Sequence, residues 1–273
     1  MGLGLIGGSI ALRLREQAPH ILITGLDRPD RLAAARRLGA IHEGAAALAD
    51  LGGVDLVVLA VPPAAMLEIV PQLAHLPATT VVTDVASTKR QIVAAARSAG
   101  LAAFVGGHPM AGSERAGIDH ARADLFDGRP WLLVEGTGGP AACDTVERFV
   151  RIMGADPRWI DADGHDRCVA YVSHLPQLVA VALMNAAADG AGHDALRLAG
   201  PAFRDMTRLA SSPPELWQSI VPSNADYVAE AIGRFLQNLP VGRDLSDDGW
   251  VREAFDRAGG ARARWRGDDS SSG

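Results

Sequence analysis

The sequence has few cysteines, no excess of positive charge and no long apolar run, and each of these absences argues against a class of protein. Cys143 and Cys168 are the two cysteines in 273 residues, too few for a disulfide framework, so a reducing, cytoplasmic setting is expected. The net charge of −6 gives no reason to expect nucleic acid or an anionic membrane as a partner. No basic segment of a signal peptide opens the chain, and no uninterrupted apolar run reaches the roughly 18 residues of a membrane span. A cytoplasmic globular protein is predicted, with neither membrane nor nucleic acid as partner.

Short apolar stretches alternate with helical segments over the first part of the chain. The run VDLVVLAV at 54–61 is almost continuously apolar, which is typical of a parallel strand buried on both faces. Further strands are expected at 21–26, 81–85, 104–105, 131–134 and 158–160, with helices between them at 31–38, 90–98 and 140–153. Such alternation predicts an α/β fold with a doubly wound parallel sheet of the Rossmann type.

The second part of the chain has a helical pattern without strands. Long helices are expected over 165–188 and 215–239, the latter interrupted near Pro222 and Asn224. We therefore expect a dinucleotide-binding domain at 1–163, an all-helical substrate and dimerisation domain at 164–257, and a disordered tail at 258–273. Helices this apolar usually pack against more than their own chain, so a homodimer through this half is predicted.

A glycine-rich segment opens the chain and predicts a dinucleotide site. Residues 2–7 read GLGLIG, which matches G-x-G-x-x-G and runs directly into an apolar helix. The glycines would allow a tight turn and a close approach to a pyrophosphate, and the helix N-terminus would offer free N–H groups. Asp27, twenty residues after Gly7, can accept both ribose hydroxyls and so favours NAD, while Arg28 beside it leaves NADP possible. The expected cofactor-binding residues are Gly2, Gly4, Leu5, Ile6, Gly7, Asp27, Arg28, Val61, Pro62 and Ser87.

The strand that should precede this fingerprint is missing, because Met1 alone stands before Gly2. In the order 3-2-1-4-5-6 that strand would lie at the centre of the sheet. Three explanations stay open: the protein starts upstream of Met1, the sequence is shortened, or another segment fills the gap.

Four further segments narrow the function. They are DVASTK at 84–89, GGHPMAGSE at 106–114, YVSHLPQ at 171–177 and FRDMTRLA at 203–210. Together with the glycine-rich opening, and in this order, they resemble the prephenate/arogenate dehydrogenase family of tyrosine biosynthesis. The resemblance runs from Gly2 to about Asn224. It implies NAD-dependent oxidative decarboxylation of prephenate, arogenate or both, giving 4-hydroxyphenylpyruvate or tyrosine.

The expected chemistry needs a base, because removing hydride from a carbinol carbon leaves a hydroxyl proton to be accepted. A neutral imidazole is the usual choice near pH 7. The resemblance makes His108 the catalytic histidine, with Ser87 orienting it or the substrate hydroxyl.

The substrate carries carboxylates, so an arginine is expected to bind it. By resemblance this residue is Arg208, with His174 helping to bind or orient the acid. Pro176 should kink the helix near His174 and could turn it toward the cleft. Ser113, Glu114 and Trp217 are further candidates for the site, Trp217 from the partner subunit. His165 and Asp166 are read here as the start of a helix, with Asp163 as its cap.

Other functions remain open. A relative acting on an amino-substituted prephenate would use the same ring chemistry. A β-hydroxyacid dehydrogenase or imine reductase is disfavoured, since these enzymes usually rely on a lysine or aspartate in the helical domain. A non-catalytic, NAD-binding regulatory protein could share the fold. No metal is expected, because the sequence has no H-E-x-x-H and no C-x-x-C motif.

Overall fold

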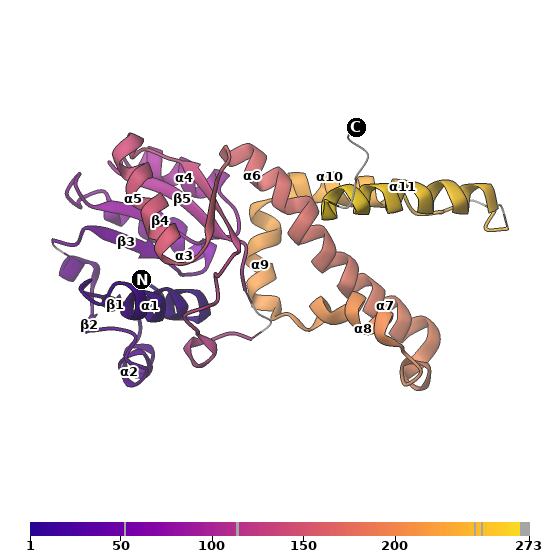
Figure 1. Cartoon of the computed structure of the whole chain (residues 1–273), viewed down its shortest axis with the longest axis horizontal. Helices are drawn as coiled ribbons and strands as arrows, with labels where there is room; N and C mark the ends of the chain where they lie inside the picture. Colours follow the sequence, from indigo (N-terminus) through magenta and orange to yellow (C-terminus); the bar gives the residue numbers. More distant parts are fainter. Residues whose placement is uncertain (52, 113–114, 243, 247, 268–273) are drawn as a thin grey trace. The chain divides into compact units, whose positions relative to one another are not determined.

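The computed structural model describes residues 1–267 except 52, 113, 114, 243 and 247 (Figure 1). These residues fall into two compact units, one from Met1 to Ala229 and one from Glu230 onward. Each unit is described by itself below, and the candidate site belongs entirely to the first.

Seven strands form the sheet region of the first unit. A five-stranded sheet has the order β3 (Leu56–Leu59), β4 (Val81–Asp84), β5 (Phe104–Pro109), β6 (Pro130–Glu135) and β7 (Asp156–Trp159). Strands β1 (Thr24–Leu26) and β2 (Glu43–Ala45) pair in parallel as a separate two-stranded sheet. The predicted Rossmann-type fold is confirmed.

The two sheets are joined by hydrogen bonds of Met1 and Gly2. The Met1 amino group donates to the Val58 carbonyl (2.8 Å), and the Ala60 N–H donates back to the Met1 carbonyl (2.7 Å). On the other side, the Gly2 N–H donates to the Leu26 carbonyl (3.0 Å). Met1 and Gly2 therefore bridge the ends of β1 and β3 with ladder-like bonds, although the described chain has no strand between them.

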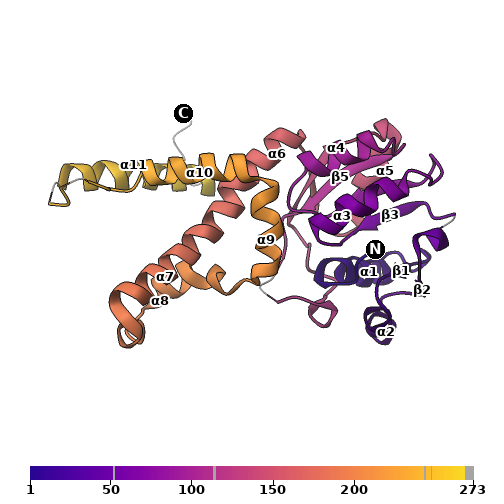
Figure 2. The ribbon, with the colours of Figure 1, turned by 180° about the vertical axis from the view of Figure 1, so that it is seen from behind.

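Helices cover both faces of the five-stranded sheet (Figures 1 and 2). On one face, α1 (Leu5–Gln17) and α5 (Gly139–Ile152) pack through Ile10 and Val146 against a core that includes Trp131. On the other face, α3 (Pro63–Ile69) and α4 (Arg90–Ser98) contribute Met66 and Ile92 to a second core. Helix α2 (Pro29–Arg37) packs with part of α1 in a third core, and 3₁₀ turns occur at η1 (Leu48–Leu51) and η2 (Val70–Leu73).

Strand β6 departs from the predicted parallel pattern, because it pairs with β5 in antiparallel fashion. A parallel strand needs a crossover connection of a dozen or more residues, usually a helix. Among its described residues, the segment between β5 and β6 contains the short 3₁₀ turn η3 (Ile118–His120) and no longer helix. The chain therefore re-enters the sheet in the opposite direction.

The second half of the chain is helical, as predicted. The first long helix consists of α6 (Ala162–Val169), a π-helical segment η4 (Ala170–His174) and α7 (Leu175–Leu196). It is followed by α8 (Pro201–Thr207), the 3₁₀ turn η5 (Arg208–Ser211), α9 (Pro214–Ser223), α10 (Ala225–Gln237) and α11 (Asp248–Arg266). The interruption expected inside 215–239 is real, since α9 ends and α10 begins at either side of Asn224.

The disorder predicted from Ala258 is not observed over residues 258–266, where α11 continues to Arg266. Alanine and arginine, which dominate this stretch, are among the strongest helix formers, and the prediction gave their charge more weight than their propensity. Residues 268–273 lie outside the described part. The boundary expected near residue 163 stays a prediction.

One helix of the described chain, Ala162–Gly192, is long and apolar enough to cross a membrane by length and composition alone. Polar residues interrupt this helix, so it is not an uninterrupted apolar run of the kind that the sequence analysis excludes. Two of the polar residues that interrupt it, His174 and Gln177, are buried and hydrogen-bonded within the fold.

Candidate active site

The glycine-rich loop packs closely against the end of β3 and the start of α1. Gly2 has φ +85°, and a Cβ there would lie 2.4 Å from the Ala60 carbonyl oxygen. A Cβ on Gly7 would lie 1.9 Å from the Gly2 carbonyl oxygen, so α1 can approach the loop only with glycine at this position. Around Gly4, by contrast, no described atom lies within 4 Å of a built Cβ. The open space at Gly4 leaves room for the phosphate groups of a ligand. It lies beside the N-terminus of α1, which has no side-chain cap.

Asp27 lies directly after β1 and is tied to the same loop. Its Oδ2 accepts the Leu3 N–H (2.6 Å) and its Oδ1 accepts the Arg28 N–H (2.7 Å). These bonds hold the carboxylate beside the fingerprint, and each oxygen keeps lone pairs for ribose hydroxyls. Arg28 is exposed, while Val61 and Pro62 follow β3 next to Gly2.

His108 lies at the end of β5 and begins a chain of buried hydrogen bonds. Its Nδ1 lies 3.0 Å from Nε2 of His165, and Nδ1 of His165 lies 2.8 Å from Oδ1 of Asp166. His165 and Asp166 are fully buried, and His108 is 8% exposed. Burial lowers the pKa of His108 well below its usual value, and the neighbouring His165, Lys89 and His174 lower it further. His108 is therefore neutral near pH 7.

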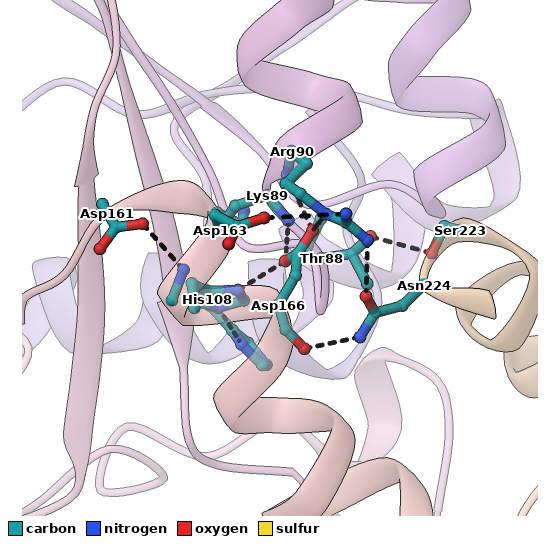
Figure 3. A network of polar contacts seen from close by, with 12 residues as sticks. Thr88, Lys89, Arg90, His108, Asp161, Asp163, Asp166, Ser223 and Asn224 are labelled. Atoms are coloured by element: carbon teal, nitrogen blue, oxygen red, sulfur yellow. Dashed lines mark hydrogen bonds and ion pairs between the residues drawn. The ribbon is translucent and has the colours of Figure 1, made fainter. Parts of the chain in front are cut away.

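Asp166 is the anchor of this network (Figure 3). It accepts the backbone N–H groups of Lys89 (2.6 Å) and Arg90 (3.0 Å), and the Arg90 Nε lies 3.2 Å from Oδ2. Burial by itself would raise the pKa of this carboxyl group. The hydrogen bonds from His165 and from the Lys89 and Arg90 backbone outweigh burial, and the pKa lies below its usual value.

A buried ion pair supports the strand that carries His108. Lys89 Nζ donates to Asp84 and to the Gly107 carbonyl oxygen (2.6 Å), while Asp84 Oδ1 accepts the Gly107 N–H (3.0 Å). A Cβ on Gly107 would lie 2.5 Å from the Asp84 carbonyl oxygen, so β4 and β5 approach closely here. This pair therefore fixes the backbone directly before His108.

His174 ends the π-helical segment and is held by Asn224. The Asn224 Nδ2 lies 2.7 Å from the Asp166 carbonyl oxygen and 3.3 Å from the His174 Nδ1, while its Oδ1 accepts from Arg90 (3.1 Å). Because Arg90 can only donate, the amide of Asn224 must direct Nδ2 toward His174. Neutral His174 then carries its proton on Nε2, and burial lowers its pKa to about 4.

Two buried donors beside each other have no partner in the described part of the chain. They are the Nε2 of His174 and the Nε1 of Trp217. The two rings contact each other edge to face, with centroids 6.0 Å apart. Trp217 thus lies next to His174 of its own chain. An acceptor such as a carboxylate would satisfy these donors.

The remaining predicted residues are placed as follows. Ser87 is half-buried between β4 and α4, and Arg208 is exposed at the start of η5. Within the described residues, no hydrogen bond or ion pair joins Arg208 to His108 or His174. Gln177 reaches the same segment, with its Nε2 donating to the Leu209 carbonyl oxygen (2.7 Å). Ser113 and Glu114 lie outside the described residues.

Sequence reasoning missed several residues that the structure brings to this site. His165 and Asp166 begin a helix as expected, but they also contact His108 and α4. The cap of that helix is Asp161 and not Asp163, since the Asp161 Oδ1 accepts the Gly164 N–H (2.8 Å). Asp163 accepts the Tyr227 hydroxyl instead (2.6 Å). Asn224 gave no local signal, because its partners come from three distant segments.

Comparison with known proteins gives matches over nearly the whole chain. Residues 10–157 match the family model of the prephenate dehydrogenase nucleotide-binding domain, and residues 161–245 match the model of its dimerization domain. The chain belongs to the prephenate dehydrogenase family.

Individual relatives agree with the family models. A prephenate dehydrogenase of Lactococcus lactis is 34% identical over 88% of this chain and 68% of its own. A cyclohexadienyl dehydrogenase of Zymomonas mobilis is 29% identical over 88% of this chain and 84% of its own.

Solved structures extend the agreement. The Aquifex aeolicus prephenate dehydrogenase, in complex with hydroxyphenyl propionate and NAD⁺, superposes with a TM-score of 0.88 at 29% identity, covering 98% of this chain and 96% of its own. The Synechocystis arogenate dehydrogenase has a TM-score of 0.81 at 29% identity, covering 97% and 98%. The predicted resemblance, the NAD-dependent dehydrogenase class and the Rossmann cofactor domain are confirmed at the level of the family.

Proposed function

We propose that this chain oxidises and decarboxylates prephenate, arogenate or both, with NAD as the hydride acceptor. The observation that carries the proposal is a neutral, buried His108 whose Nδ1 contacts His165, while no hydrogen bond joins its Nε2 to another of the described residues. Bound NAD would take hydride from the carbinol carbon of the substrate. The bond to the ring carboxylate breaks, its electron pair enters the ring, and CO₂ leaves as the ring becomes aromatic.

His108 is the base of this reaction. Its Nε2 accepts the proton of the carbinol hydroxyl as the carbon–oxygen double bond forms. When CO₂ leaves, the electron pair moves through the ring to that oxygen, and the protonated His108 returns the proton to give the phenol. The low pKa keeps the imidazole neutral, so the lone pair is present at physiological pH. Ser87, at the carboxyl end of β4, orients the hydroxyl or the imidazole from the adjacent strand.

His174, Trp217 and Arg208 bind the acidic groups of the substrate. The two unpartnered N–H donors of His174 and Trp217 suit a carboxylate, and Arg208 adds a cation from η5. Ser113 and Glu114 complete the proposed binding residues. Arg208 is exposed in this structure, and its guanidinium is the proposed partner of a substrate carboxylate.

The cofactor is bound by the loop from Gly2 to Gly7, with Asp27 on the ribose of NAD. NADP stays possible because Arg28 is adjacent. The proposal includes a cytoplasmic homodimer that forms through the residues matching the dimerization model. No part of it requires a membrane, nucleic acid or a metal.

The direct test follows NADH formation at 340 nm with prephenate and with arogenate, using the parent protein and His108→Asn. Turnover that falls by about 10²- to 10⁴-fold in the variant is expected, because a general base contributes that much. His75→Asn, at an exposed histidine, is the matched control and should match the parent. NAD binding without turnover of either acid would instead favour an amino-substituted prephenate as substrate, or a non-catalytic binder.

A further inference from the structure

We propose that His165 and Asp166 form a positioning pair that fixes the proton of His108 on Nδ1, so that Nε2 always carries the lone pair. The inference rests on the proposed function, in which His108 is the base. It concerns a different question: which nitrogen of that base is free, and which residues decide it.

The direction of each hydrogen bond follows from the charge of Asp166. This carboxylate has a pKa below its usual value and accepts the backbone N–H groups of Lys89 and Arg90. An ionised carboxylate can only accept, so the Nδ1 of His165 must donate to it across 2.8 Å.

A neutral His165 that donates from Nδ1 has its lone pair on Nε2. That nitrogen lies 3.0 Å from the Nδ1 of His108, which must therefore donate. The sequence Asp166, His165, His108 thus leaves the Nε2 of His108 unprotonated.

The opposite arrangement would require His165 to be an imidazolium. Burial lowers the pKa of His165 and the Lys89 cation lowers it further, although Asp166 acts in the other direction. His165 is also fully buried, where an extra charge is costly. Near pH 7 the neutral form is therefore favoured, and the proton stays on the Nδ1 of His108.

His165 and Asp166 lie in a different element of the chain from His108, the base that they orient. His108 is the last residue but one of β5, whereas His165 and Asp166 lie in the first turns of α6, which is capped by Asp161. Asp166 is joined to α4 through two backbone N–H groups. Small changes in how α6 packs on α4 would thus alter the state of the base without touching substrate or cofactor.

The decisive experiment reads the protonation of His108 without turnover. Ring ¹⁵N chemical shifts of ¹⁵N-histidine-labelled protein distinguish the two neutral forms, and His108→Asn identifies the His108 signals among the eight histidines. At pH 7 we expect the form protonated on Nδ1. A His108 protonated on Nε2 in the folded parent protein would overturn the inference, whether or not the enzyme is active.

A pair of variants tests the consequence for catalysis. His165→Gln can present a side-chain oxygen near the position of Nε2, whereas His165→Met fills similar volume and offers no strong acceptor. We expect kcat to fall by about 10- to 100-fold in His165→Met with KM within about twofold of the parent. His165→Gln should recover most of that loss, and His75→Met, at an exposed histidine, should equal the parent.

The outcomes separate this inference from the proposed function. If the parent protein turns over neither prephenate nor arogenate, the proposed function fails, and the ¹⁵N shifts still decide the inference. If the parent turns over substrate but both His165 variants lose kcat equally, or neither loses it, the positioning role is wrong. If His165→Met does not fold, the test consists of the ¹⁵N shifts of His108 in the parent protein and the kcat of His165→Gln relative to the parent.

Discussion

At the scale of single residues, two buried histidines of the same site are prepared for opposite tasks. His108 donates from Nδ1 to His165, which leaves an acceptor at Nε2. His174 accepts at Nδ1 from Asn224, which leaves a donor at Nε2. Burial holds the pKa of both histidines below the usual value, so both are neutral and the difference between them does not come from charge. In the proposed function these identical side chains serve as a base and a binding group, because their neighbours make opposite kinds of hydrogen bond.

His174→Leu is expected to raise KM for the acid substrate by about 10- to 100-fold and to change kcat less. The variant removes one donor to a charged group, an interaction worth about 1.5–3 kcal/mol. Initial rates at varied prephenate concentration measure both parameters. His75→Leu, at an exposed histidine, is the control. A large fall in kcat at unchanged KM would place His174 in the chemical step instead.

At the scale of elements, three glycines lie in the first turn of α1 and the loop before it, and they are needed for different reasons. Gly2 and Gly7 are required by contacts within the protein, since a Cβ on either would meet a carbonyl oxygen. Gly4 faces open space, so no contact within the described chain requires glycine there, and its proposed role is to let the pyrophosphate approach.

Gly4→Ala is expected to weaken NAD binding by about tenfold or more while leaving the midpoint of urea unfolding nearly unchanged, because the added methyl occupies space that a pyrophosphate needs. Gly190→Ala is the matched control. It is an exposed helical glycine of α7 whose built Cβ also meets no described atom within 4 Å. Calorimetric titration with NAD measures the affinity. An unchanged Kd in Gly4→Ala would remove the loop from the cofactor site.

The π-helical segment is a second device at this scale. Pro176 has no N–H and its ring would clash with the carbonyl of residue 172 in a regular α-helix. The wider turn over Ala170–His174 precedes this proline and ends at His174. The π segment thus directly precedes the proline, and such segments are often found at functional sites. The kink itself stays a prediction.

At the scale of the whole molecule, the buried neutral histidines make stability depend on pH. His108, His165 and His174 all have a lowered pKa in the folded state, so the unfolded chain binds more protons than the folded chain below about pH 6.5. Their contribution is fully present above that value and is lost as pH falls toward the folded pKa.

The free energy of unfolding should therefore fall steadily between pH 6.5 and about 4. His174 alone, with its pKa lowered from 6.5 to about 4, corresponds to roughly 3 kcal/mol. Urea unfolding at a series of pH values measures the change. His174→Leu should show a shallower fall than His75→Leu, and a parent protein equally stable at pH 7 and pH 5 would contradict the expectation.

Assembly is the other property of this scale. In the most apolar 18-residue stretch of the helix Ala162–Gly192, 28% is buried within the chain. The family model that matches this half of the chain is a dimerization domain. Sedimentation is expected to give twice the 28.5 kDa mass of the chain.

Ala182→Arg should shift that equilibrium toward monomer, because it places a charge on the exposed face of α7. Ala33→Arg makes the same change at an exposed alanine of α2 and should leave the dimer intact. Equal masses for both variants and the parent would mean that this face of α7 is not the interface.

The sequence by itself determined much of this protein. Apolar runs of strand length, a fingerprint of three glycines and the segments around His108, His174 and Arg208 predicted the fold, the cofactor and the family, because each depends on residues close together in the chain. Only the tertiary structure decided how the site is built. His165, Asp166, Asn224 and Lys89 come from segments far apart, and their roles follow from hydrogen-bond directions that no local pattern encodes. The antiparallel pairing of β6 with β5 likewise follows from how the chain connects the two strands. The hydrogen bonds of Met1 follow from backbone pairing that only the three-dimensional arrangement of the strands shows.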